Sequence, residues 1–211
     1  MLGLGEHGHR PLGADGRAPH APKGARQISL LGAQAFLQAA GFAGVIGVPL
    51  NRHLTISWHV AETIGRVQDL QREVLQLAAK WLRYHGVQPA FVWVVENGYV
   101  LGHHSHIAIH VPDHLVRRFR VMADRWVQHV GGNPKNRGAV RMTRDKFGRA
   151  DYHAAIEGLL RYMLKGLELE AARLLRIEPQ YDKAGTVIGK RCGFSESLGP
   201  TAQERHLQAA A

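Results

Sequence analysis

The chain of 211 residues has a single cysteine, Cys192, and no long apolar run. One cysteine excludes an intramolecular disulfide framework and a cysteine-rich zinc module. The most apolar stretch, residues 28–50, is interrupted by polar side chains, and its longest clean run, residues 39–50, is too short to span a bilayer. The residues after Met1 do not have the layout of a signal peptide. We therefore expect a soluble, reduced, cytoplasmic protein with no membrane partner.

Acidic residues are also scarce, with 17 Asp and Glu against 27 Lys and Arg, which gives a formal charge of +10 when the 14 histidines are neutral. This surplus of positive charge favours a polyanionic partner, although charge alone does not separate DNA from RNA or acidic lipid. Many histidines in a chain so poor in cysteine direct the search toward metal or phosphate chemistry.

The composition divides the chain into four segments. Residues 1–27 are rich in Gly, Pro, Arg and His without an apolar period, and we expect a disordered basic tail. Residues 28–48 predict an N-terminal helix weakened by glycines. Residues 49–176 carry the organised domain, and residues 177–211 predict a basic C-terminal loop and tail.

The organised domain alternates between two kinds of periodicity. Four segments with strand character are residues 50–59, 90–96, 103–111 and 139–143. Three segments with apolar residues three and four apart predict helices at residues 62–84, 112–130 and 152–176. The order predicts an α+β sandwich, in which helices pack on a mostly antiparallel sheet.

Two histidines, His104 and His106, lie two residues apart in the predicted strand 103–111. Residues i and i+2 of a strand point to the same face, so both imidazoles project together while Ile107 and Ile109 face the core. Two imidazoles on a rigid strand form a good half of a divalent-metal site, which an oxygen ligand would complete. An H-x-H pair arises about once by chance in so histidine-rich a chain. The prediction of a metal site therefore depends on the position of the pair in a strand.

Glu96 ends the preceding strand and is the candidate oxygen ligand. If the two strands pair across a loop formed by residues 97–103, Glu96 lies beside His104. Asn97 and Gly98 favour a competing tight turn, which would leave Glu96 about 15 Å from His104 along the strand. We favour the longer loop, and a solvated strand end is the functionless alternative for Glu96.

Tyr162 and Lys165 are the third candidate element. At positions i and i+3 of the predicted helix they share one face. A phenol can attack a phosphodiester when a cation stabilises the developing charge, and Lys165 would be that cation. The alternative is a tyrosine half-buried at the flank of the helix beside a lysine that extends to solvent.

Together these elements resemble the HUH endonuclease superfamily, especially the single-tyrosine replication initiators of rolling-circle plasmids and phages. The sequence LTIS at residues 54–57 is similar to the family's first motif. HSHIAIHVP at residues 104–112 is similar to the second, except that Ser105 replaces a bulky apolar residue, and YMLK at residues 162–165 is similar to the third. IGKRCGFSESLGP at residues 188–200 also looks like such proteins, and we assign it only a basic DNA contact by Lys190 and Arg191.

The resemblance implies a ferredoxin- and RRM-like nuclease domain and a mechanism. His104, His106 and Glu96 would hold Mg²⁺ or Mn²⁺ against the scissile phosphate of single-stranded DNA. Tyr162 would attack, releasing a 3′-hydroxyl and forming a 5′-phosphotyrosine that another 3′-hydroxyl resolves. No G-x-x-x-x-G-K-[ST] loop occurs, so a host helicase would have to unwind the duplex.

Two other functions fit parts of the sequence. A metal-independent two-histidine phosphoesterase needs two H-x-[ST]-x elements on neighbouring strands. The element that begins at His53 fits well, and the element that begins at His103 fits only formally. A non-catalytic nucleic-acid-binding module would use the same sandwich, with Trp58, Phe91 and Trp93 stacking on bases if they are exposed. Their alternation indicates core positions instead.

Overall fold

The fold is taken from a computed structural model, which describes residues 24–25, 27–63, 66–99, 102–133, 135–136, 138–143, 152–180, 184–185 and 187–210. Its strands are β1 (Gly24–Ala25), β2 (Arg52–Ser57), β3 (Phe91–Gly98), β4 (Gly102–Ile109), β5 (Val140–Thr143), β6 (Val187–Ile188) and β7 (Cys192–Phe194). Its α-helices are α1 (Leu30–Val45), α2 (Val67–Tyr84), α3 (Val116–His129), α4 (Tyr152–Met163), α5 (Leu169–Leu175) and α7 (Pro200–Ala210). Two 3₁₀ turns, η1 (Asp113–Leu115) and η2 (Glu196–Leu198), precede α3 and α7.

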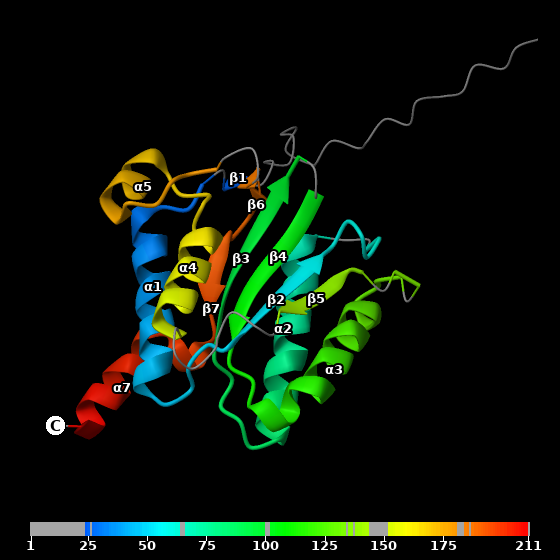
Figure 1. The fold of residues 1–211 in the computed structure, drawn as a ribbon, viewed down its shortest axis with the longest axis horizontal. Coiled ribbons are helices and arrows are strands. Elements are labelled where there is room, and N and C mark those ends of the chain that lie inside the picture. The colour runs from blue at the N-terminus through cyan, green and yellow to red at the C-terminus, as the bar shows by residue number, and fades with distance from the viewer. Residues whose placement is uncertain are drawn as a thin grey trace, which may run out of the picture.

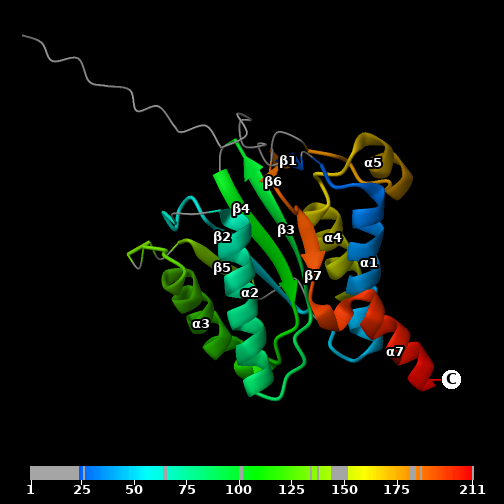
Figure 2. The ribbon, with the colours of Figure 1, turned by 180° about the vertical axis from the view of Figure 1, so that it is seen from behind.

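The main sheet has five antiparallel strands in the order β5-β2-β4-β3-β7, and helices cover both of its faces. Helices α2 and α3 lie on one face, and α1, α4 and α5 lie on the other (Figures 1 and 2). The predicted α+β class with a mostly antiparallel sheet is therefore confirmed. Among the described residues, no helix is both long and apolar enough to cross a membrane.

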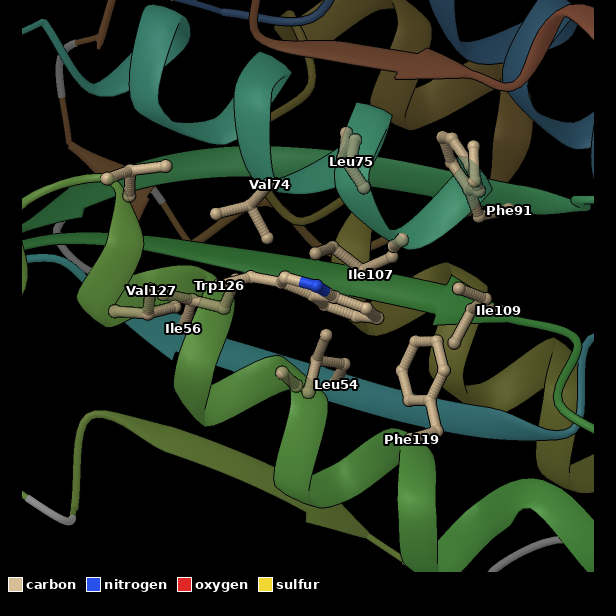
Figure 3. Close-up of a cluster of buried hydrophobic side chains, with 14 of the residues drawn as sticks. Leu54, Ile56, Val74, Leu75, Phe91, Ile107, Ile109, Phe119, Trp126 and Val127 are labelled. Carbon is tan, nitrogen blue, oxygen red and sulfur yellow. The ribbon is translucent and has the colours of Figure 1, made fainter. Parts of the chain in front are cut away.

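The alternation of apolar side chains along the strands builds two cores. Leu54 and Ile56 of β2 and Ile107 and Ile109 of β4 point toward α2 and α3, where Phe119 is fully buried among them (Figure 3). Each such side chain contributes about 1.5–3 kcal/mol when it leaves water. The intervening positions face the second core, which α1, α4 and α5 complete. A polar side chain at one of these intervening positions therefore points toward the helices α1, α4 and α5.

The β3–β4 hairpin pairs the predicted residues but has a shorter loop than we expected. Glu96 lies directly opposite His104, as the longer-loop alternative requires. However, β3 continues to Gly98 and β4 begins at Gly102, so the expectation that residues 97–103 form the loop is wrong, and so is the tight turn at Asn97. The ladder extends one pair beyond Asn97, to Gly98 and Gly102, and Gly102 adopts a φ of +60°, which favours glycine.

Three further expectations need correction. The helix predicted at residues 62–84 begins only at Val67. The single helix predicted at residues 152–176 is two helices, α4 and α5, separated by a turn at residues 164–166. The described part of the C-terminal segment is not only loop and tail, because β7 extends the main sheet beside β3 and α7 follows it.

The predicted N-terminal segments have different outcomes. The helix expected within residues 28–48 is α1. Most of the tail expected at residues 1–27 lies outside the described residues, although Gly24 and Ala25 pair with β6 as a short strand instead of belonging to a disordered tail.

Candidate metal centre

Glu96, His104 and His106 form one buried cluster on the face of the sheet that α4 covers. The directly paired Glu96 and His104 place Glu96 Oε2 2.9 Å from His104 Nε2. His106, two residues further along β4, places its Nε2 3.6 Å from the same oxygen. One ligand atom from each residue lies within 4.8 Å of the others, which is compact enough for one metal ion to reach all three.

Hydrogen bonds at the outer nitrogens orient both imidazoles. His104 Nδ1 donates to the carbonyl of Gly102 over 2.9 Å, so in the neutral ring the Nε2 lone pair faces Glu96. His106 Nδ1 lies 3.1 Å from His53 Nε2 and 3.3 Å from Thr55 Oγ1. Histidine ligands of metals are usually held in this way through the nitrogen that does not bind the metal.

The inner nitrogen of His106 is an unsatisfied buried atom. Within the described part of the chain, His106 Nε2 has no hydrogen-bond partner. Burying a polar atom without a partner costs about 1–3 kcal/mol, so such atoms usually mark a site that a ligand completes. The cluster of two nitrogens and one carboxylate oxygen therefore fits a divalent metal ion.

The charge of the cluster is adapted to bind a cation. Burial raises the pKa of Glu96, but the neighbouring imidazoles of His104 and His106 and the charge of Lys165 outweigh burial and hold this pKa well below its usual range. Burial lowers the pKa of His106, although Glu96 opposes the shift. At neutral pH the cluster therefore has an ionised carboxylate and a neutral His106, the forms that bind metals.

Lys165 is buried in the same cluster. Its ammonium lies 2.6 Å from Glu96 Oε1, while Glu96 Oε2 faces the histidines, so the two oxygens of this carboxylate have different neighbours. Burial lowers the pKa of Lys165, and Glu96 opposes the shift. A surface lysine that extends to solvent, the functionless alternative for this residue, is wrong because the side chain is only 3% exposed.

Tyr162 covers the cluster from the last turn of α4. Its ring packs edge-on against His106 with 5.2 Å between the ring centroids, and Lys165 Nζ lies 3.8 Å from the centre of the tyrosine ring. The residue is 45% exposed, so the phenol borders both the buried cluster and solvent. All five candidate residues of the sequence are thus brought together in one place.

The turn after α4 places Lys165 in the cluster. The amide of Ile28 donates to the carbonyl of Gly166, and Leu167 pairs with Ile28, which stops the helix. Gly166 packs closely on Arg191, because an added Cβ would stand 2.7 Å from a guanidinium nitrogen of this residue and would require it to shift. Arg191 is 4% exposed, so the direct DNA contact predicted for this residue is wrong.

Ser105 lies on the opposite face of β4 from the histidines. It accepts a hydrogen bond from Trp58 Nε1 over 2.7 Å and donates to Gln71 Oε1. The departure from the resembled motif therefore affects the core beneath α2 and leaves the metal cluster untouched. Trp58 and Phe91 are also buried, so these two rings are not available for base stacking.

The geometry does not assemble the two-histidine phosphoesterase. His53 and Thr55 lie beside His106 on one face of the sheet. Ser105 belongs to the other face, so its H-x-S element does not share a cleft with His53. Sequence reasoning missed the positioning contacts of His53 and Thr55 with His106. The alternation of β2 identified their polar face, but only the pairing of Thr55 with His106 across β2 and β4 brings them to the site.

Comparison with known proteins adds no assignment, because no family model, curated protein or solved structure matches the chain.

Proposed function

We propose that this chain is a metal-dependent endonuclease that nicks and rejoins single-stranded DNA through a 5′-phosphotyrosine at Tyr162. The proposal places it with the single-tyrosine HUH proteins that its sequence resembles, as an initiator of rolling-circle-type replication of a plasmid or phage. The main support is the contact between Tyr162 and His106. It joins a partly exposed phenol from a helix to a buried metal-ligand cluster from two strands.

Glu96, His104 and His106 would hold the metal, which when bound would polarise the scissile phosphate and neutralise its charge. Two imidazoles and one carboxylate suit Mn²⁺ better than Mg²⁺, because Mg²⁺ is bound mainly through oxygen ligands. The cluster supplies three protein ligands, so a bound ion would keep coordination positions open for phosphate oxygens.

The reaction needs no redox partner. The Tyr162 oxygen forms a bond to phosphorus while the bond from phosphorus to the 3′ oxygen breaks. The phenol loses one proton to solvent and the departing 3′ oxygen gains one, so the reverse attack by a 3′-hydroxyl restores the strand. The exposure of Tyr162 gives its proton a route to water.

Lys165 would stabilise the negative charge that develops on the reacting oxygens. Its ammonium lies beside the Tyr162 ring and is excluded from solvent, where a fixed charge acts more strongly than in water. Tyr152 does not offer a second nucleophile at the site. It is the first residue of α4, and its side chain hydrogen-bonds the backbone of Leu50.

The test is formation of a covalent complex. The full chain is incubated with labelled single-stranded oligonucleotides and Mn²⁺, and a denaturant-stable protein–DNA adduct is sought. The adduct should disappear in Tyr162→Phe and on chelation of the metal, and it should persist in Tyr84→Phe, which alters an exposed tyrosine at the end of α2. DNA binding without any adduct would favour the non-catalytic module, and hydrolysis without metal would overturn the proposal.

A further inference from the structure

A groove runs along α2, between this helix and residues of the C-terminal segment. It consists of two adjoining hollows of about 540 Å³ each that share Gln68. We call this feature the α2 groove. It is lined among others by Arg66, Gln68, Arg83, Trp93, Lys190 and Phe194. It does not include the metal cluster, which lies under α4.

Two aromatic rings and one cation form the centre of the α2 groove. Lys190 Nζ lies 5.9 Å from the ring centroid of Trp93 and 6.0 Å from that of Phe194. The Trp93 ring lies directly over Gly193, where an added Cβ would stand 2.7 Å from the indole. The absence of a side chain at Gly193 thus lets the indole lie flat along β7 at the wall of the groove. Partly exposed rings beside a cation are the arrangement on which nucleobases stack.

The charge of the α2 groove suits a phosphate backbone. Four basic side chains line the groove: Arg66, Arg72, Arg83 and Lys190. Glu196 is the acidic residue in the same lining. Asp69, at the border of the groove, pairs with Arg66 and Arg72. Lys190 and Arg83 are exposed and form no ion pair among the described residues. The groove is therefore positive, within a chain of formal charge +10.

The groove reaches the hairpin that carries the metal cluster, on the opposite face of the sheet from the cluster. Its second hollow is lined by Asn97 and His103, which are paired with each other one step along the ladder from Glu96 and His104. Lys190 and Arg191 are neighbours in the sequence but have different surroundings. Lys190 lines the groove, whereas Arg191 packs on Gly166 beside the cluster. A strand lying in the groove would thus reach the sheet at the hairpin that carries the cluster.

We infer that the α2 groove binds a segment of single-stranded DNA that flanks the scissile phosphate. A base would stack on Trp93 and Phe194, and backbone phosphates would contact Lys190 and Arg83. The relation to a scissile phosphate rests on the proposed function. Binding to the groove itself needs neither the metal nor Tyr162.

The experiment measures affinity separately from chemistry. Binding of a labelled oligothymidylate to full-length Tyr162→Phe protein is followed by fluorescence anisotropy in EDTA at several salt concentrations. Lys190→Glu with Arg83→Glu should weaken binding and reduce the salt slope by about 0.7 for each phosphate that the protein no longer neutralises. Gly193→Ala should displace the indole of Trp93 and remove the stacking of one base. The affinity for DNA should then fall by a factor of about 5 to 160, the contribution of one stacked base.

The matched control is Arg117→Glu with Arg118→Glu, which makes the same change of charge at two exposed positions on α3 outside the groove. Circular dichroism and thermal unfolding establish that each variant is folded. Equal losses in the double groove variant and in the double α3 control would overturn the inference, as would binding of polyglutamate as tight as that of DNA. A folded Gly193→Ala that binds like its parent would also overturn it.

The two proposals fail in different ways. Groove-dependent DNA binding without a Tyr162 adduct would refute the nuclease and leave the groove assignment intact. An adduct that forms in the wild-type background while groove variants bind DNA unchanged would refute only the groove.

Discussion

Glu96 and Lys165 form a buried ion pair that joins the strand bearing the metal ligands to the turn that follows Tyr162. Lys165 Nζ lies 2.6 Å from Glu96 Oε1, and both side chains are at most 3% exposed. The pair therefore sets the position of the α4 end over the sheet. Its carboxylate also faces His104 with the other oxygen, so the same residue serves the fold and the site.

Removing one partner of this pair should destabilise the metal-free protein strongly. Glu96→Gln leaves the Lys165 ammonium buried without its counter-charge, and Lys165→Met leaves the carboxylate without the ammonium. We expect each single variant to lose about 3–5 kcal/mol of unfolding free energy in urea titrations, and the double variant to lose clearly less than the sum.

The control for this cycle is Glu157→Gln, which removes the exposed pair of Glu157 with Arg161 on α4. It should cost less than about 1 kcal/mol. Additive losses in the double variant of the buried pair would contradict a direct interaction between Glu96 and Lys165.

Affinity for Mn²⁺ should fall as the pH is lowered from 7 through the pKa of His106, which lies below the ordinary histidine value of 6.5. The pKa of His106 is depressed by burial, so the ring is neutral at pH 7, and acidification through that depressed pKa lets protons compete with the metal. The pKa of Glu96 is held well below its usual range, so this carboxylate stays ionised throughout and does not contribute. Calorimetric titration with Mn²⁺ across this range measures the effect. A constant affinity would argue against histidine ligation.

His53 should act as a positioning residue for His106. Its Nε2 lies 3.1 Å from His106 Nδ1, the nitrogen that must be held if Nε2 is to face a metal. We expect His53→Ala to weaken Mn²⁺ binding by about 10- to 100-fold, and Thr55→Val to do so less. His129→Ala, at an exposed histidine on α3, should leave the affinity unchanged. An unchanged affinity in His53→Ala would show that β4 alone fixes the ring.

Local pattern was sufficient for the strands that carry the ligands. Alternation of Leu54 and Ile56 with polar neighbours predicts which face of β2 is buried, and the i, i+2 spacing of His104 and His106 predicts their common direction. The pairing of Glu96 with His104 also followed from one of the two hairpin alternatives. These features depend on residues close together in the sequence.

Features set by distant residues were not predictable. Apolar spacing continues through Met163, Leu164 and Leu167, so the periodicity does not reveal where the helix ends. Gly166 is a local stop signal, and the amide of Ile28 binds the carbonyl of this glycine at the break. Burial of Arg191 likewise depends on Gly166 from another part of the chain. The C-terminal helix α7 buries none of its residues, so it has no apolar face that a periodicity argument could detect.

The most direct test of the central claim is to locate the covalent linkage. The adduct formed with single-stranded DNA and Mn²⁺ is digested with nuclease and trypsin, and the modified peptide is sequenced by mass spectrometry. Cleavage after Arg161 and Lys165 gives the peptide YMLK, residues 162–165, and the account predicts a nucleotide on its tyrosine. A nucleotide on residues 150–161, which contain Tyr152, or on any peptide other than YMLK would contradict it.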